Sequence, residues 1–335
     1  MIDRETLLEV FDIAERRRNE RRSFLKMAGS AVAATAGATM LSACDDGGRS
    51  EPPPAPTPAP PPTSGLPASD VDVLNFALNL EYLEANYYTF AAFGTGVNST
   101  STTGTGTQGA VTGGRKVAFA DATVAAYARE IAADENEHVL FLRSQLASSA
   151  VAQPAINIDG GATGAFTAAA RSAGVVGSTG TFDPYASDEN WLLGGMLLSD
   201  VGVTAYKGSA SLISNKIILE AAAGILAVEA YHSGLLRTLL YRKGLTMPAL
   251  RTNAGLISNA RDTLDNPVDD DQGIGPVTIN GGQASNIVPS DSNGIVFGRT
   301  AGDVLNIAFL NAGAVTSGGF FPAGVNGNIK TSTAG

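Results

Sequence analysis

Residues 135–138 read Glu-Asn-Glu-His and residues 229–232 read Glu-Ala-Tyr-His, and these two short stretches decide the fold. The chain of 335 residues contains only two histidines, and each stands three positions after a glutamate. On a helix, residues three apart lie one above the other on the same face, so a carboxylate oxygen and an imidazole nitrogen converge on one point. The repeated spacing predicts two helices that each aim a pair of metal-ligating side chains in one direction.

Apolar residues continue this spacing on both sides of each pair, in the steps of three and four that are typical of the buried seam of a bundle helix. One helix is predicted from Asp121, a candidate N-cap, to about residue 148, with the seam Val124, Tyr127, Ile131, Glu135, His138, Leu142 and Leu146. Another is predicted from about 215 to 243, with the seam Ile218, Ala222, Ile225, Glu229, His232, Leu236 and Leu239. The motif residues therefore stand where core leucines would otherwise lie, while Asp134 and Glu137 are expected to be solvated.

A third helix with a charged residue in its seam is predicted near the start of the folded body. It begins at Ser69 or Asp70, either of which could cap it, and ends near Gly94. The steps of its seam alternate between four and three along Leu74, Leu78, Glu81, Ala85, Tyr88 and Ala92. Glu81 is therefore expected to face the same axis as the two motifs.

The remaining helix is expected to start after Asp188 and to run to about residue 213, but its register is ambiguous. A seam through Leu193 and Met196 would turn Asp200 toward the bundle axis. A competing seam would turn Asp200 partly aside, and it consists of Leu197, Val201, Thr204, Gly208 and Ser211. Spacing alone leaves both registers open, so Asp200 is a candidate ligand.

Charge balance supports a metal site at the axis. Burying several unpaired carboxylates would exceed a domain's whole stability of about 5 to 15 kcal/mol, so a positive charge must lie among them. The three clear seams contain no lysine or arginine. Two divalent ions would balance the acidic candidates, with both histidines neutral, and ligands without sulfur favour iron or manganese. The predicted ligand set is Glu81, Glu135, His138, Asp200, Glu229 and His232.

Four other residues are weaker candidates. Glu84 lies one turn from Glu81 and could reach the site, although a solvated position is favoured. Tyr88 could donate a hydrogen bond near the metals or relay a radical, but ordinary core packing is the better interpretation. Tyr206 and Tyr231 are interpreted in the same way.

With these motifs, the chain resembles the ferritin-like domain proteins related to plant desiccation proteins. Residues 74–88 are similar to the first helix of bacterioferritins and rubrerythrins, residues 134–138 to their second, and residues 229–232 to their last. Residues 201–206 resemble the desiccation-related branch, and residues 318–322 do so more loosely.

This resemblance implies a mainly α fold, namely an antiparallel four-helix bundle over residues 69–244 with a long crossover at 149–188. A short helix at 166–173 is expected within the crossover. The resemblance also implies a pair of non-haem iron or manganese ions, with the two imidazoles within roughly 10 Å of each other. The chain departs from the family in the third helix, because metal-binding members carry glutamate there and this chain offers the shorter Asp200.

The segments outside the bundle carry signals of other kinds. Residues 1–44 resemble a twin-arginine export signal that ends in a lipobox, with Cys44 as the lipidated residue. Residues 45–68 form a proline-rich linker, which implies a lipoprotein of the periplasm or cell envelope held off a membrane. Residues 245–335 are expected to form an irregular extension packed on the bundle, with a helical pattern at 300–311. The net charge of −10 argues against a nucleic-acid partner.

Two functional hypotheses follow. The first is an oxidoreductase that acts on oxygen, peroxide or ferrous iron, with a small oxidant or a metal ion as its partner and no assigned catalytic residue beyond the ligands. The second is a non-catalytic envelope protein of the stress or desiccation response that retains the bundle. A small homo-oligomer is compatible with either hypothesis, whereas the linker, anchor and extension argue against a closed ferritin cage.

Overall fold

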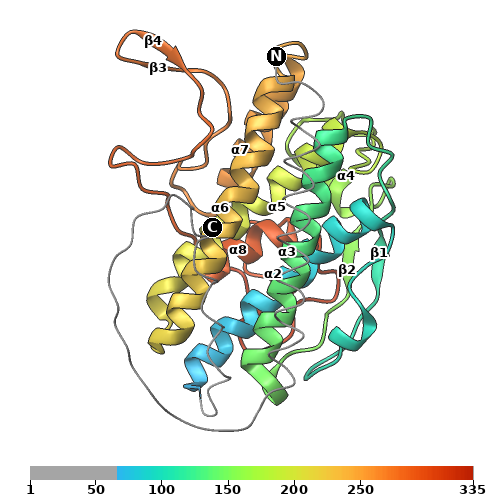
Figure 1. Ribbon diagram of the computed structural model, residues 1–335, viewed down its shortest axis with the longest axis vertical. Helices are drawn as coiled ribbons and strands as arrows, with labels where there is room; N and C mark the ends of the chain where they lie inside the picture. Colours follow the sequence, from blue (N-terminus) through green and yellow to red (C-terminus); the bar gives the residue numbers. More distant parts are fainter. Residues whose placement is uncertain (1–65, 335) are drawn as a thin grey trace, which may run out of the picture. The chain divides into compact units, whose positions relative to one another are not determined.

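The computed structural model describes residues 66–334, and the predicted export signal, Cys44 and most of the linker lie outside these residues. Four long helices form the bundle (Figure 1). Their bounds are Ala68–Phe93 for α2, Ala122–Leu146 for α3, Asp188–Ser209 for α5 and Lys216–Lys243 for α6. The mainly α, ferritin-like bundle predicted from the two motifs is confirmed.

The helices pack as two antiparallel pairs, α2 with α3 and α5 with α6. Asn75, near the start of α2, donates to the carbonyl oxygen of Ser149 just beyond α3 at 3.0 Å. At the opposite end, Lys243 of α6 pairs with Glu189 of α5 at 2.8 Å. The pairs face each other through α2 with α5 and α3 with α6, so all four helices surround one axis.

The helix ends agree with the sequence signals at three positions and differ at the first. The side chains of Asp121 and Asn215 cap α3 and α6, and Gly94 ends α2 in the left-handed conformation. Helix α2, however, follows Pro67 without a side-chain cap. Asp70 instead lies buried and accepts hydrogen bonds from the backbone N–H groups of Ser214 and Asn215. This carboxylate therefore stabilises the start of α6 rather than the start of its own helix.

The two long connections are held together by a short parallel sheet. The loop after α2 contains the 3-10 helix η1 (Ser99–Ser101) and strand β1 (Val111–Gly113). The crossover contains the 3-10 helix η2 (Ala147–Ser149), strand β2 (Ile156–Ile158) and helix α4 (Ala165–Ser172), which confirms the short helix predicted there. Strands β1 and β2 pair in parallel, with Val111 opposite Ile156.

The chain beyond residue 245 is more regular than predicted. Helix α7 (Ala249–Asp265) packs against α5 and α6, so the expectation of an irregular segment is wrong there. The exposed hairpin of β3 (Val277–Ile279) and β4 (Gly282–Ala284) stands away from the helices in Figure 1, and α8 (Ala301–Phe309) confirms the helical pattern. Helix η3 (Ala210–Leu212) extends α5.

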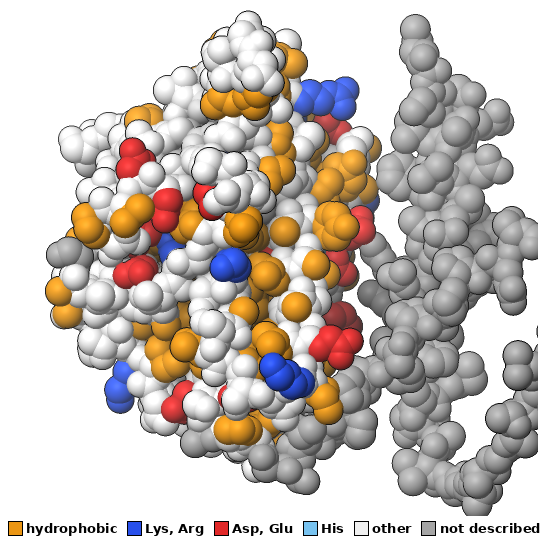
Figure 2. Space-filling model, turned by 90° about the vertical axis from the view of Figure 1, so that its left-hand side faces the viewer, with side chains coloured by type: hydrophobic (Ala, Val, Ile, Leu, Met, Phe, Trp, Pro, Cys, Tyr) orange, Lys and Arg blue, Asp and Glu red, His pale blue; other side chains and the backbone are white. Residues whose placement is uncertain are grey.

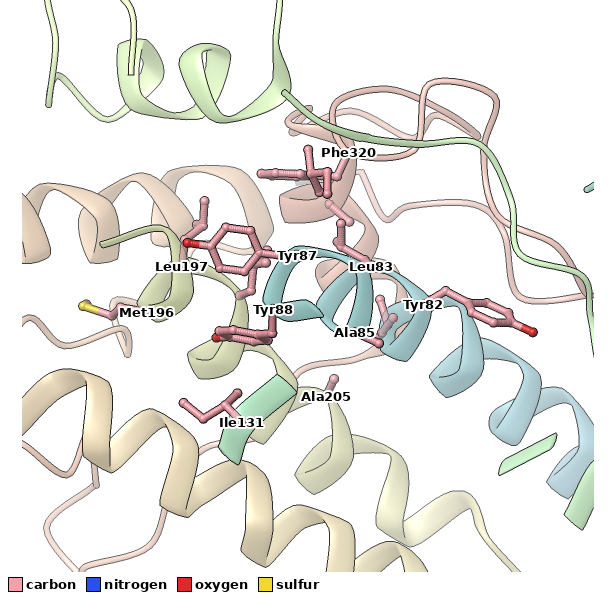
Figure 3. Close-up of a cluster of buried hydrophobic side chains, with 14 of the residues drawn as sticks. Tyr82, Leu83, Ala85, Tyr87, Tyr88, Ile131, Met196, Leu197, Ala205 and Phe320 are labelled. Carbon is pink, nitrogen blue, oxygen red and sulfur yellow. The ribbon is translucent and has the colours of Figure 1, made fainter. Parts of the chain in front are cut away.

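The end of the chain contributes to the core. Phe320 and Phe321 are buried, and the ring of Phe320 meets that of Phe166 in α4 edge to face, at a centroid distance of 5.0 Å. Figure 3 shows Phe320 above Leu83, while Tyr82 points away from this cluster. None of the helices within residues 66–334 has the length and apolar composition of a membrane-spanning helix.

Candidate metal centre

Three helices bring metal-ligating atoms together at mid-length. Glu81 of α2, Glu135 and His138 of α3 and Glu229 of α6 each offer one ligand atom, and these atoms all lie within 4.8 Å of one another. All four residues are buried. The seam positions predicted for these residues therefore converge as the helical spacing requires.

The second histidine joins the cluster through a shared carboxylate. Nδ1 of His232 lies 2.8 Å from one oxygen of Glu135, and Nδ1 of His138 lies 3.4 Å from the other. Nδ1 of His138 is also 3.2 Å from Glu81 and 3.6 Å from Glu229. The two imidazole centroids are 6.2 Å apart, within the limit that a paired site requires.

Two further side chains orient this inner set, and spacing did not reveal their roles. Nε2 of His232 lies 3.3 Å from Asp134, whose side chain is 44% exposed, so this residue is only partly solvated. Carboxylates that hold the outer nitrogen of a ligating histidine fix its orientation and tautomer. The hydroxyl of Tyr206 donates to Oε1 of Glu81. Glu137, in contrast, is exposed as predicted.

Asp200 lies outside this cluster, in a network of ion pairs. Its Oδ2 atom is 2.8 Å from Arg237 of α6 and 2.9 Å from Arg261 of α7, and Ser233 donates to its Oδ1 atom. These two guanidinium groups hold the pKa of Asp200 below its ordinary value despite its burial. Its charge is therefore balanced by arginine, and the structure does not bring it to the other predicted ligands.

Neither of the two predicted seams of α5 faces the metal centre. The side that meets α2 carries Gly195, Ser199, Gly202 and Tyr206, which are three or four residues apart and all buried. Ser199 bonds to the hydroxyl of Tyr88 at 2.7 Å. Small residues give no apolar signal in a sequence, so this seam could have been found only by considering glycine and serine as core residues.

Glu84 is buried beside the cluster, contrary to the solvated position that was favoured for it. It is 6% exposed, and its Oε1 lies 2.8 Å from the position that a Cβ atom at Gly202 would occupy. Oε2 of Glu229 lies 2.7 Å from the same point. The missing side chain of Gly202 thus leaves space that two carboxylates share.

Burial and mutual repulsion shift the pKa values of the acidic groups. Burial raises the pKa values of Glu84 and Glu229 well above the ordinary range, and the charge of Glu135 raises them further. Burial also raises the pKa of Glu81, although His138 partly offsets this shift. Glu135 is the exception, because the two histidines beside it outweigh the effect of burial and hold its pKa far below normal.

The pKa values of both histidines are also raised. Burial lowers the pKa of His138, but the charges of Glu81 and Glu135 raise it well above normal. The pKa of His232 rises to about 9, because hydrogen bonds to Asp134 and Glu135 outweigh its burial. Protons and metal ions would therefore compete for these side chains, because imidazoles and carboxylates bind metal in their deprotonated forms.

The orphaned polar atoms fit a metal pair. Glu84, Glu135 and Glu229 each have a buried Oε2 atom without a hydrogen-bond partner. Among residues 66–334, no lysine or arginine forms an ion pair with Glu81, Glu135 or Glu229. Carboxylates and imidazoles that face inward are the donor set of non-haem iron or manganese.

Of the remaining tyrosine candidates, Tyr88 has a structural role and Tyr231 lies at the surface. Tyr88 packs in the core, edge to face with Trp191, and also bonds to Ser199. Tyr231 is 75% exposed and points away from the metal centre, because it lies between the two motif positions of α6.

The face drawn in Figure 2 shows acidic and basic side chains but no histidine.

An antiparallel bundle with glutamate and histidine at its axis defines a class of carboxylate-bridged metalloproteins. Comparison with known families agrees, because a model of the ferritin-like domain matches residues 69–242. The chain belongs to the ferritin-like domain family.

Two relatives indicate which branch of the family is similar. The desiccation-related protein PCC13-62 of Craterostigma plantagineum is 30% identical over 250 residues, which cover 70% of this chain and 76% of the relative. The ferritin-like catalase Nec2 of Nesocodon mauritianus is 26% identical over 279 residues, which cover 80% and 86%. No solved structure matches the chain.

Proposed function

We propose that this protein is a dimetal oxidoreductase that binds two non-haem manganese or iron ions and consumes peroxide. The observation that carries the proposal is the convergence of Glu81, Glu135, His138 and Glu229 within 4.8 Å in a buried site that no lysine or arginine among residues 66–334 neutralises. The relative named a ferritin-like catalase supports this reaction class.

The bound metals would supply a change of oxidation state beside a substrate oxygen. Disproportionation oxidises one peroxide to dioxygen and reduces another to water, so its electrons balance without an external reductant. Around this chemistry, Asp134 orients His232, and the hydroxyl of Tyr206 positions Glu81. Glu135 lies between both histidines and would hold the ions together with them.

A small apolar cavity next to the site favours a small oxidant. Its volume is about 30 Å³, room for one or two water-sized molecules. Glu84 and Gly202 line it on the side of the metal centre, and Ile307 and Phe320 line it from the C-terminal extension. A bulky organic substrate would not fit this space.

The test is metal analysis of protein purified after native export, followed by assays of peroxide consumption and ferrous oxidation. About two equivalents of metal with turnover of peroxide would support the proposal. The Glu135→Gln variant should lose metal and activity together, while Glu137→Gln, an exposed change on the same helix, should retain both. Failure of the native protein to bind either metal would refute the proposal.

A non-catalytic role is the second candidate, because the other relative is named for desiccation rather than for a reaction. In that case the bundle and its metals would reinforce the fold. Stoichiometric metal without turnover of peroxide, oxygen or ferrous iron would favour this role.

We further propose export by the twin-arginine route and lipid anchoring at Cys44. Incorporation of labelled palmitate into the wild-type protein, and not into Cys44→Ala, would support the anchor.

A further inference from the structure

We propose that Glu84, on the first helix of the bundle, supplies the carboxylate that metal-binding relatives place on the third helix. This inference rests on the proposed dimetal function and concerns which residue completes the site. It assigns a ligand to a position that the sequence pattern treats as solvated, and it removes the need for Asp200 at the metals.

The first support is position. Oε1 of Glu84 and Oε2 of Glu229 lie 2.8 and 2.7 Å from the same point, which a Cβ atom of Gly202 would fill. The two oxygens therefore lie no more than 5.5 Å apart, the sum of these two distances. Metal–oxygen bonds in such sites are about 2.0 to 2.2 Å long, so rotation of the two carboxylates toward each other would let one ion bind both. Glycine at this position of α5 lets a side chain from α2 reach across.

The second support is a buried polar atom without a hydrogen-bond partner. Oε2 of Glu84 is buried and has no hydrogen-bond partner. The neighbouring hydroxyl of Ser199 is bonded to that of Tyr88 at 2.7 Å. Oε2 of Glu84 therefore lacks the partner that a buried carboxylate requires.

The third support is charge. With Glu84, the centre contains four carboxylates, which balance two divalent ions when both histidines are neutral. Asp200 cannot serve in this balance, because Arg237 and Arg261 already neutralise it. Asp200 also lies two residues from Gly202, which is about 200° around a helix, so it faces α6 and α7 instead.

The decisive experiment measures manganese per chain by elemental analysis and exchange coupling between the ions by electron paramagnetic resonance. Glu84→Gln should fall from about two ions to about one and lose the coupling, because one ion loses a ligand. Asp200→Asn should retain the wild-type content and coupling. Glu137→Gln is the matched control on the bundle surface.

A second variant tests directly whether the carboxylate can be supplied from α5 instead of α2. The double change Glu84→Ala with Gly202→Glu returns the carboxylate to the third helix in the space that Glu84 vacates, and it should restore the second ion and the coupling that Glu84→Ala alone loses. If Glu84→Gln keeps the wild-type metal content while Asp200→Asn loses one ion, the inference is wrong and the dimetal function stands. If wild-type protein binds no metal, the proposed function itself fails.

Discussion

At Glu229, folding and the proposed metal binding would favour opposite charge states of one carboxylate. The side chain is 1% exposed, and burial together with the charge of Glu135 raises its pKa well above normal. Without metal, the native state must therefore keep this group protonated or bear an unpaired buried charge. As a ligand of the proposed metal centre, the same group would carry its charge.

We predict that Glu229→Gln stabilises the metal-free protein while abolishing metal binding. An amide of the same shape carries no charge, so the free energy of unfolding at neutral pH should rise by roughly 1 kcal/mol. Urea denaturation of chelator-treated protein measures this difference. Glu220→Gln, an exposed change on the same helix, should leave it unchanged, and a loss of stability in metal-free Glu229→Gln would contradict the prediction.

At the scale of the element, α7 is joined to the bundle by buried ion pairs. Arg261 of α7 contacts both Asp200 of α5 and Asp271, which also pairs with Arg299. Arg299 completes the network through Asp265, the last residue of α7. Three arginines and three aspartates balance in charge, so the network can be buried without a counter-ion.

Removal of one member should leave the buried charges of this network unbalanced. We predict that Arg261→Leu lowers the free energy of unfolding by about 3 to 5 kcal/mol, because Asp200 and Asp271 each lose a guanidinium partner in a buried position. Metal content per folded chain should stay at the wild-type value, since this network is separate from the metal centre. Denaturation and elemental analysis test both statements, with the exposed Arg242→Leu as control.

The segment after α7 should also make stability depend on pH. Burial raises the pKa of Asp270 to about 6, which Arg299 only partly offsets, whereas the unfolded chain has the ordinary value. The folded state therefore binds more protons between these two pKa values, and this carboxyl destabilises the protein as pH rises through about 6.

We predict that Asp270→Asn is more stable than wild type at pH values above that pKa, and that the advantage shrinks on acidification and vanishes below the ordinary aspartate pKa of about 3.9. Urea titrations of both proteins across this range measure the difference. An advantage that is constant with pH would show that the titration of Asp270 is not its cause.

At the scale of the whole molecule, the proposed metal binding would stabilise the folded state. A metal that binds only the native state should raise the free energy of unfolding by about 2.7 kcal/mol at a free concentration 100 times its dissociation constant. Thermal unfolding at increasing manganese concentration tests this, and Glu135→Gln should show no such rise. An equal rise in both proteins would place the stabilising ions elsewhere.

Assembly is a second property of the whole molecule. The C-terminal extension packs on α5 and α6 through α7, and its hairpin β3–β4 is exposed, so outer faces of the bundle are covered or obstructed. On the face drawn in Figure 2, lysine and arginine side chains are separated from one another. We predict a monomer or small homo-oligomer for the full chain in detergent by light scattering, whereas a 24-subunit particle would contradict this prediction.

The sequence by itself determined the bundle and most of the residues of the candidate metal centre. Helical spacing is a local property, so the seams around Glu135 and Glu229 could be assigned from apolar residues three and four apart, and the cap at Asp121 from its side chain. Helix α7 was not predicted, because few apolar residues mark its buried side and Arg261 occupies part of it.

Only the tertiary structure decided which acidic side chains face one another. The register of α5 depends on glycine and serine, which carry no apolar signal, and on arginines contributed by α6 and α7. Those arginines draw Asp200 away from the axis, and the space at Gly202 admits Glu84. A charge finds its partner by position in space, and distances between helices far apart in the chain are fixed by packing rather than by spacing along it.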